Sequence, residues 1–136
     1  MTRDWQDATS SGDAVRVASM LDAGADINAL DGHGQTALMN AAHKGHAEVV
    51  RLLSKRGANL DHTAKFGLSA LMLAVIADHP EVVRVLVDAG ADITLRGSPS
   101  AAPIYDKTAL ELAEQMKRTR CAEELQRAET KHKNRT

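Results

Sequence analysis

The residues with the clearest capacity for chemistry in this sequence are six histidines and a single cysteine, Cys121. His43 and His46 have the spacing of a metal-binding pair, and His33 and His62 lie one predicted loop away on either side. Imidazole is a common zinc ligand, but no cysteine or carboxylate cluster supplies the further ligands that such a site needs. We therefore expect no metal and no cofactor.

Cys121 is the one candidate nucleophile in the sequence. Arg118 and Arg120 are nearby and could lower the pKa of its thiol, but no histidine is placed beside it to act as a base. The sequence also has no P-loop and no glycine-rich dinucleotide motif. Cys121 falls at an apolar position of its segment, which is typical of a small buried side chain. We expect the protein not to be an enzyme.

The composition favours an all-helical fold. Hydrophobic residues make up 43% of the chain but aromatic residues only 2%, so the core must be built from Ala, Leu, Val, Ile and Met. The formal net charge of -1 gives no electrostatic reason to expect nucleic acid. The chain has a polar start, a lone cysteine and no long apolar run, so we expect a cytoplasmic protein without membrane contact.

An internal repeat organises the chain. Gly24, Gly57 and Gly90 are 33 residues apart, and each is followed by Ala and then Asp or Asn. The same interval relates two further pairs, Thr36 with Ser69 and His46 with His79. Several markers in one register indicate tandem structural units rather than chance similarity.

Each unit has the signals of two short helices. Thr36 is a suitable N-cap for a first helix over residues 37–44, and Gly45 can end it in the left-handed conformation. A second helix is expected over residues 47–55, ended by Gly57 and followed by a short hairpin. Thr108 and Glu111 predict a capping box in the last unit. One helix pair cannot bury its own apolar face, so the pairs must stack into a solenoid.

The units resemble ankyrin repeats. The family phrase is matched by DGHGQTALMNAA at residues 31–42 and by GHAEVVRLL at residues 45–53. The resemblance implies an all-α solenoid of stacked helix-turn-helix units with short β-hairpin loops. It divides a single domain, 1–129, into repeats at about 1–30, 31–63, 64–96 and 97–129. We expect the basic tail, residues 130–136, to be disordered.

The sequence departs from the family pattern at several positions, among them Ala37, Ala70 and Ala109 for the family proline and Ala64 for the Asp that opens a hairpin turn. The family histidine that follows the conserved leucine is replaced by Met39, Met72 and Glu111. His46 and His79, by contrast, stand at the family's Gly-His position, where the ring is expected to pack and to form a local hydrogen bond.

The resemblance also implies where a partner binds. Ankyrin-repeat proteins usually dock partners on the concave side, which is formed by the hairpin tips and the exposed ends of the first helices. Transferred by position, the candidate binding residues are His33, Gln35, His43, Lys44, Lys65, Phe66, Leu68, Ile76, Ile104, Tyr105, Lys107 and Met116. The apolar members predict an interface, and the basic rim favours a partner with an acidic edge. Alternatively, Phe66 and Tyr105 pack on each other and on the long loop.

These features predict a non-catalytic adaptor that binds a protein partner of unknown identity. An alternative is a regulatory subunit or inhibitor that covers the active site of a partner enzyme. The inserted residues 98–103 are either an added contact arm or a neutral lengthening of the last hairpin. We expect a monomer, although the apolar group could drive weak self-association.

Overall fold

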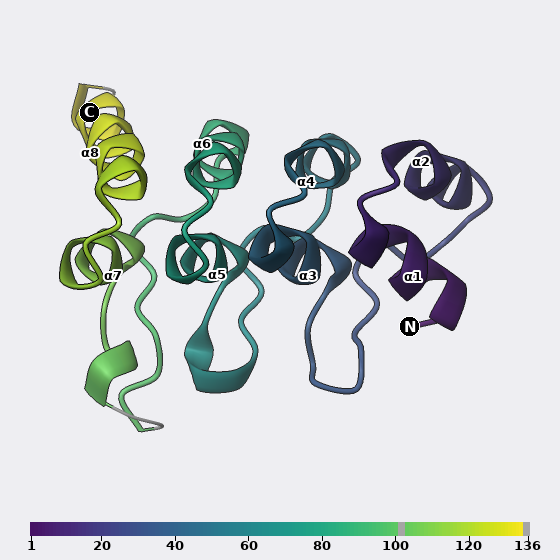
Figure 1. The fold of residues 1–136 in the computed structure, drawn as a ribbon, viewed down its shortest axis with the longest axis horizontal. Helices are drawn as coiled ribbons and strands as arrows, with labels where there is room; N and C mark the ends of the chain where they lie inside the picture. The colour runs from purple at the N-terminus through teal and green to yellow at the C-terminus, as the bar shows by residue number, and fades with distance from the viewer. Residues whose placement is uncertain (101–102, 135–136) are drawn as a thin grey trace.

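The computed structural model describes residues 1–100 and 103–134, which contain eight α-helices and no β-strand (Figure 1). Two short 3-10 helices, η1 (Lys65–Gly67) and η2 (Pro103–Tyr105), lie in the connections before α5 and α7. The α-helices in chain order are α1 (Arg3–Ser11), α2 (Ala14–Asp22), α3 (Ala37–Lys44), α4 (Ala47–Lys55), α5 (Ala70–Ile76), α6 (Pro80–Ala89), α7 (Ala109–Gln115) and α8 (Thr119–Asn134).

The helices form two parallel rows. Figure 1 shows the first helices of the pairs, α1, α3, α5 and α7, in one row and the second helices, α2, α4, α6 and α8, in the other. The longer connections before α3, α5 and α7 project from the first-helix row, away from the second helices (Figure 1). This arrangement is the stack of helix pairs that the sequence period predicts.

Local sequence explains where the first helices begin. The hydroxyl groups of Thr36 and Ser69 accept hydrogen bonds from the amides of Met39 and Met72, at 3.2 and 3.3 Å. The predicted capping box at the start of α7 is also present. Each of these bonds satisfies an amide that the first helical turn leaves unpaired.

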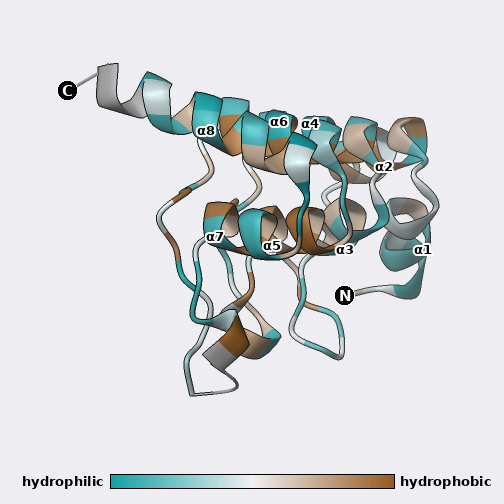
Figure 2. Ribbon diagram, turned by 60° about the vertical axis from the view of Figure 1, so that its left-hand side comes forward, coloured by the Kyte–Doolittle hydropathy of each residue, from teal (hydrophilic) through white to brown (hydrophobic). Residues whose placement is uncertain are grey.

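The hydrophobic core lies between the two rows and between neighbouring helices of the same row. Ala37, Ala41 and Ala42 are fully buried, and their small side chains let neighbouring helices approach closely. Met39 and Met72, which replace the family histidine, are each only 1% exposed and therefore contribute packing. Figure 2 shows the outward-facing side of α8 as mostly hydrophilic, as expected for the last helix of a stack.

Histidines connect successive helix pairs. His46 Nε2 lies 2.8 Å from the carbonyl oxygen of Ser10, and His79 Nε2 lies 3.1 Å from that of His43. Because a carbonyl can only accept, each ring must donate from Nε2. The bonds therefore reach back to the preceding repeat, whereas the sequence predicted local ones. They satisfy carbonyls in the last turns of α1 and α3.

Arg118 makes the corresponding bond at the last junction. Its Nη2 donates to the carbonyl oxygen of Ile76 at 2.9 Å, at the end of α5. We call these three contacts, made by His46, His79 and Arg118, the junction bonds. In the third of them a guanidinium has replaced an imidazole, and its positive charge suits the negative end of the helix dipole.

Two features differ from the sequence expectation. The hairpins close through turns and η helices, because residues such as Phe66 and Gly67 adopt left-handed backbone angles that interrupt strand pairing. Residues 130–134, expected to be disordered, continue α8. The segment from Thr119 contains no glycine or proline and is rich in Ala, Glu, Gln, Lys and Arg, which are good helix formers. The last two tail residues, 135–136, lie outside the described part of the chain.

Candidate functional site

The predicted binding residues come from two parts of each repeat. His33, Gln35, Lys65, Phe66, Leu68, Ile104, Tyr105 and Lys107 lie in the hairpins before the first helices, and His43, Lys44, Ile76 and Met116 lie at the C-terminal ends of those helices. The hairpins are side by side in Figure 1, so residues from successive repeats share one edge of the molecule.

Leu68 does not belong to the exposed surface. It is 7% exposed and belongs to the hydrophobic core, so its predicted place in an exposed surface is wrong. Its extended backbone lies directly before the N-cap Ser69, where an apolar side chain is stabilised by packing inward against the helices.

The other apolar candidates differ in exposure. Phe66, Tyr105 and Ile76 are partly buried and pack against the core. Ile104 and Met116 are 53% and 36% exposed, respectively. A partner can therefore contact Ile104 and Met116 with little rearrangement, whereas the rings of Phe66 and Tyr105 already pack against other residues of this chain. Figure 2 shows hydrophobic colour in the hairpin before α7, beside the exposed edge.

Phe66 and Tyr105 stack on each other. Their ring centroids are 4.7 Å apart and their planes are inclined by 16°, which is a stacked arrangement. The backbone of the two hairpins is also joined, because the amide of Ser98 donates to the carbonyl oxygen of Phe66 at 2.7 Å. This is the geometry of the alternative in which the two rings pack on each other.

Two glycines that the sequence reading did not single out permit this contact. A Cβ atom on Gly67 would lie 2.6 Å from the amide nitrogen of Ser98, and a Cβ on Gly97 would lie 2.0 Å from the carbonyl oxygen of Tyr105. Both distances are too short for any side chain. Gly67, which directly follows Phe66, was a signal available in the sequence, whereas Gly97 is distant from Tyr105 along the chain.

The basic side chains of the last two hairpins have different kinds of partner. Arg96 forms ion pairs with Asp106 at 3.1 Å and Glu111 at 3.0 Å. The hydrogen bond that Arg96 donates to Asp106 and the negative charge of Glu111 raise the pKa of the Arg96 guanidinium. Lys65 Nζ instead lies over the Phe66 ring, 5.0 Å from its centroid, as a cation-π contact.

Asp31 organises the hairpin before α3. Its Oδ1 accepts from the amides of His33 and Gln35, at 2.8 and 3.0 Å, and its Oδ2 accepts from Asn40 Nδ2 at 3.1 Å. Partial burial raises the pKa of the carboxyl group, but these hydrogen bonds outweigh it and leave the pKa below its ordinary value. The next hairpin has Ala64 at this position and lacks these bonds.

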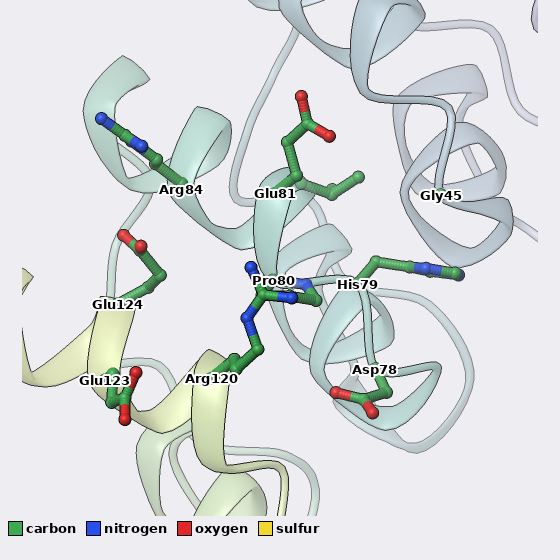
Figure 3. A pocket seen from close by; sticks show the side chains of 10 residues that line it. Gly45, Asp78, His79, Pro80, Glu81, Arg84, Arg120, Glu123 and Glu124 are labelled. Atoms are coloured by element: carbon green, nitrogen blue, oxygen red, sulfur yellow. The ribbon is translucent and has the colours of Figure 1, made fainter.

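A separate pocket of about 550 Å³ lies at the turns that follow α3 and α5, between the start of α6 and α8. Figure 3 shows Arg120 of α8 extending toward Pro80 at the start of α6, with Glu81 and Glu124 on either side. The pocket contains four carboxylates, two guanidinium groups and the ring of His79. None of the predicted binding residues lines it, and its interspersed charges match no single class of ligand.

Cys121, the candidate nucleophile, is fully buried in the hydrophobic core. Burial, reinforced by the negative charge of Asp78, raises the pKa of the Cys121 thiol to about 11, so the nearby arginines do not activate it. Within the described residues, no group of three or more His, Cys, Asp or Glu side chains could hold a metal ion. Among those same residues, no helix combines the length and apolar character that crossing a membrane requires.

Comparison with known proteins identifies the family. A family model described as ankyrin repeats matches three copies over residues 6–97, from α1 to the residue after Arg96. The pair α7 and α8 lies beyond this match. A comparison with curated proteins finds no match. The family model covers more than half of the chain, and the helix pairs stack in the same order as the sequence repeats. The chain therefore belongs to the ankyrin-repeat family.

Proposed function

We propose that this protein is a non-catalytic adaptor that binds another protein through the edge formed by its hairpins and first-helix ends. Ankyrin repeats are generally protein-protein interaction modules. The proposal is supported chiefly by the presence of exposed apolar side chains, Ile104 and Met116, on this edge. Large side chains of this kind are stabilised by burial, and a partner would provide it.

Affinity capture from a lysate of the source cells tests this proposal. The wild-type chain should retain a specific partner, and Ile104→Asp should reduce the captured amount by about tenfold, because a carboxylate would be desolvated in the interface. Ile104 is 53% exposed, so the substitution should leave the free energy of unfolding within about 0.5 kcal/mol of wild type.

Val15→Asp is the matched control. Val15 is 80% exposed on α2, in the second-helix row, and the substitution adds the same charge at a distance from the hairpins. It should not change capture. Equal loss with both variants, or with neither, would contradict binding through the hairpin edge.

The same material separates an adaptor from the alternative, a regulatory subunit or inhibitor. If the captured partner is an enzyme, its activity is measured with and without a saturating amount of the wild-type chain. An adaptor should leave the activity unchanged, whereas an inhibitor should abolish it. Light scattering over a concentration series, with and without Ile104→Asp, tests the expected monomer.

A further inference from the structure

Two lysines on the hairpin edge carry charges that no ion pair neutralises within the described residues. Lys65 and Lys107 flank the stacked pair Phe66 and Tyr105 in the sequence, one in each hairpin. Neither lysine forms an ion pair within the described residues, and Lys107 acts on Glu111 only from beyond ion-pair distance. Within that part of the chain, Lys65 contacts only the face of the Phe66 ring with its ammonium group, so both positive charges can still pair with carboxylates of a partner.

The acidic side chains of the hairpins already have ion-pair or hydrogen-bond partners within the chain. Asp106 and Glu111 both pair with Arg96. The carboxylate of Asp31, in the hairpin before α3, accepts three hydrogen bonds from its own repeat. Two further exposed acids, Asp61 and Asp92, lie at the start of the hairpins before α5 and α7, where Asp61 accepts a hydrogen bond from the amide of Asp92 and Asp92 accepts one from the amide of Thr94. Within the described residues, Lys65 and Lys107 are therefore the cations of these two hairpins whose charge no ion pair neutralises, whereas Arg96 is paired.

The hairpin that carries Lys107 also carries an exposed apolar side chain, that of Ile104. Ile104 is 53% exposed and directly precedes Tyr105, whose ring is held against Phe66. The close packing at Gly67 and Gly97 fixes the two hairpins against each other. The lysines and the isoleucine are therefore carried by one preorganised unit, which reduces the entropy lost on binding.

We propose that Lys65, Lys107 and Ile104 bind an extended segment of the partner protein that is rich in Asp and Glu and carries one apolar side chain. This inference rests on the proposed function and names the chemistry of the partner. Carboxylates pair with the two ammonium groups, and the apolar side chain covers Ile104. The small number of cations and the acids on α1 disfavour a nucleic acid, which needs a longer basic track.

Repeat spacing sets the pattern of the segment. Packed helices lie about 8 to 10 Å apart, and we expect the ammonium groups of Lys65 and Lys107, on the hairpins of adjacent repeats, to be separated by a similar distance. A segment in the polyproline II conformation advances about 3.1 Å per residue with three residues per turn, so side chains three residues apart point the same way and span about this distance. Acidic residues at every third position should therefore meet the two lysines.

Binding of synthetic peptides to the full chain tests the proposal by fluorescence anisotropy. The probe has glutamate at every third position and one leucine between two of them, and the matched probe has glutamine in place of each glutamate. We expect the glutamate probe to bind about tenfold more tightly and its affinity to fall with added salt. Equal affinity for the two probes would overturn the proposal.

Charge-reversal variants locate the contact. Lys65→Glu with Lys107→Glu should weaken binding of the glutamate probe by about tenfold or more. The matched control, Lys55→Glu with Lys131→Glu, makes the same change in net charge on α4 and α8 and should change the affinity by less than about twofold. Thermal unfolding of both variants checks that the fold is retained. Equal weakening by the two variants would overturn the assignment of the site.

Two further results separate this inference from the proposed function. If the captured partner is lost with Ile104→Asp but retained with Lys65→Glu and Lys107→Glu, the hairpin edge binds a protein and the acidic chemistry is wrong. If a single-stranded oligonucleotide binds through the same lysines more tightly than the glutamate probe, the occupant is a nucleic acid and the proposal fails.

Discussion

At the scale of single residues, Phe66 combines two opposing effects. Its φ of 64° places it in the left-handed region, which costs a residue other than glycine about 1 to 2 kcal/mol. Its ring compensates by stacking on Tyr105 and by packing against the core. The backbone angle that interrupts the hairpin is therefore also the one that directs this ring toward its neighbour.

Comparing two substitutions at Phe66 separates these effects. Phe66→Ala removes the ring but keeps the backbone strain, and should lower the free energy of unfolding by about 1 to 3 kcal/mol. Phe66→Gly also removes the ring but relieves the strain, so it should be about 1 kcal/mol more stable than the alanine variant. Urea unfolding followed by circular dichroism measures both. An alanine variant that is the more stable of the two would show that the backbone relaxes out of the left-handed region.

At the scale of helices, the junction bonds combine with glycine at the turns. The His46 ring lies over Gly12 and the His79 ring over Gly45, where an added Cβ would approach ring atoms to 2.8 and 2.7 Å. At the third junction the turn residue is Asp78, which has a Cβ, and the donor is Arg118, which is longer and flexible. The last junction therefore differs from the first two in both its turn residue and its hydrogen-bond donor.

Alanine at two glycines tests the importance of ring packing at a junction. Gly45 and Gly57 have φ of 81° and 87°, so alanine is similarly strained at either position. A Cβ on Gly57 would meet nothing within 4 Å, whereas one on Gly45 would displace His79. Gly45→Ala should therefore destabilise the protein by about 1 to 3 kcal/mol more than Gly57→Ala, measured by urea unfolding. Equal effects would mean that the ring moves aside without loss.

Helix elements were more predictable from the sequence than the contacts between hairpins. The hydroxyl caps at Thr36 and Ser69 act within one turn, so local sequence specifies them. The stack of Phe66 on Tyr105 depends on the path of two separate hairpins, which no local rule determines. Arg118 could have been found, because it follows His79 by the same interval that separates Thr108 from Ser69, but its residue type conceals the correspondence. The proposed partner site depends on these non-local contacts.

At the scale of the whole molecule, each helix pair is stabilised by its neighbours. α1 packs against α2 and α3, whereas α7 packs against α5 and α8, and the first and last pairs lie at opposite ends of the stack (Figure 1). In such an arrangement stability is approximately a sum of repeat and junction terms. A substitution in the last helix pair should therefore lower the stability of the first pair less than that of the last.

The single tryptophan allows a direct test of this expectation. Trp5 is 2% exposed on α1, so its fluorescence reports on the first pair, while circular dichroism reports on all helices. Arg118→Ala removes the junction bond to Ile76 and should destabilise the last junction by about 1 to 3 kcal/mol. The urea midpoint measured by circular dichroism should then fall further than the midpoint measured by Trp5 fluorescence. Because the wild-type transitions provide the reference for each probe, equal displacement of both midpoints in the variant would instead show that the four pairs unfold as one unit.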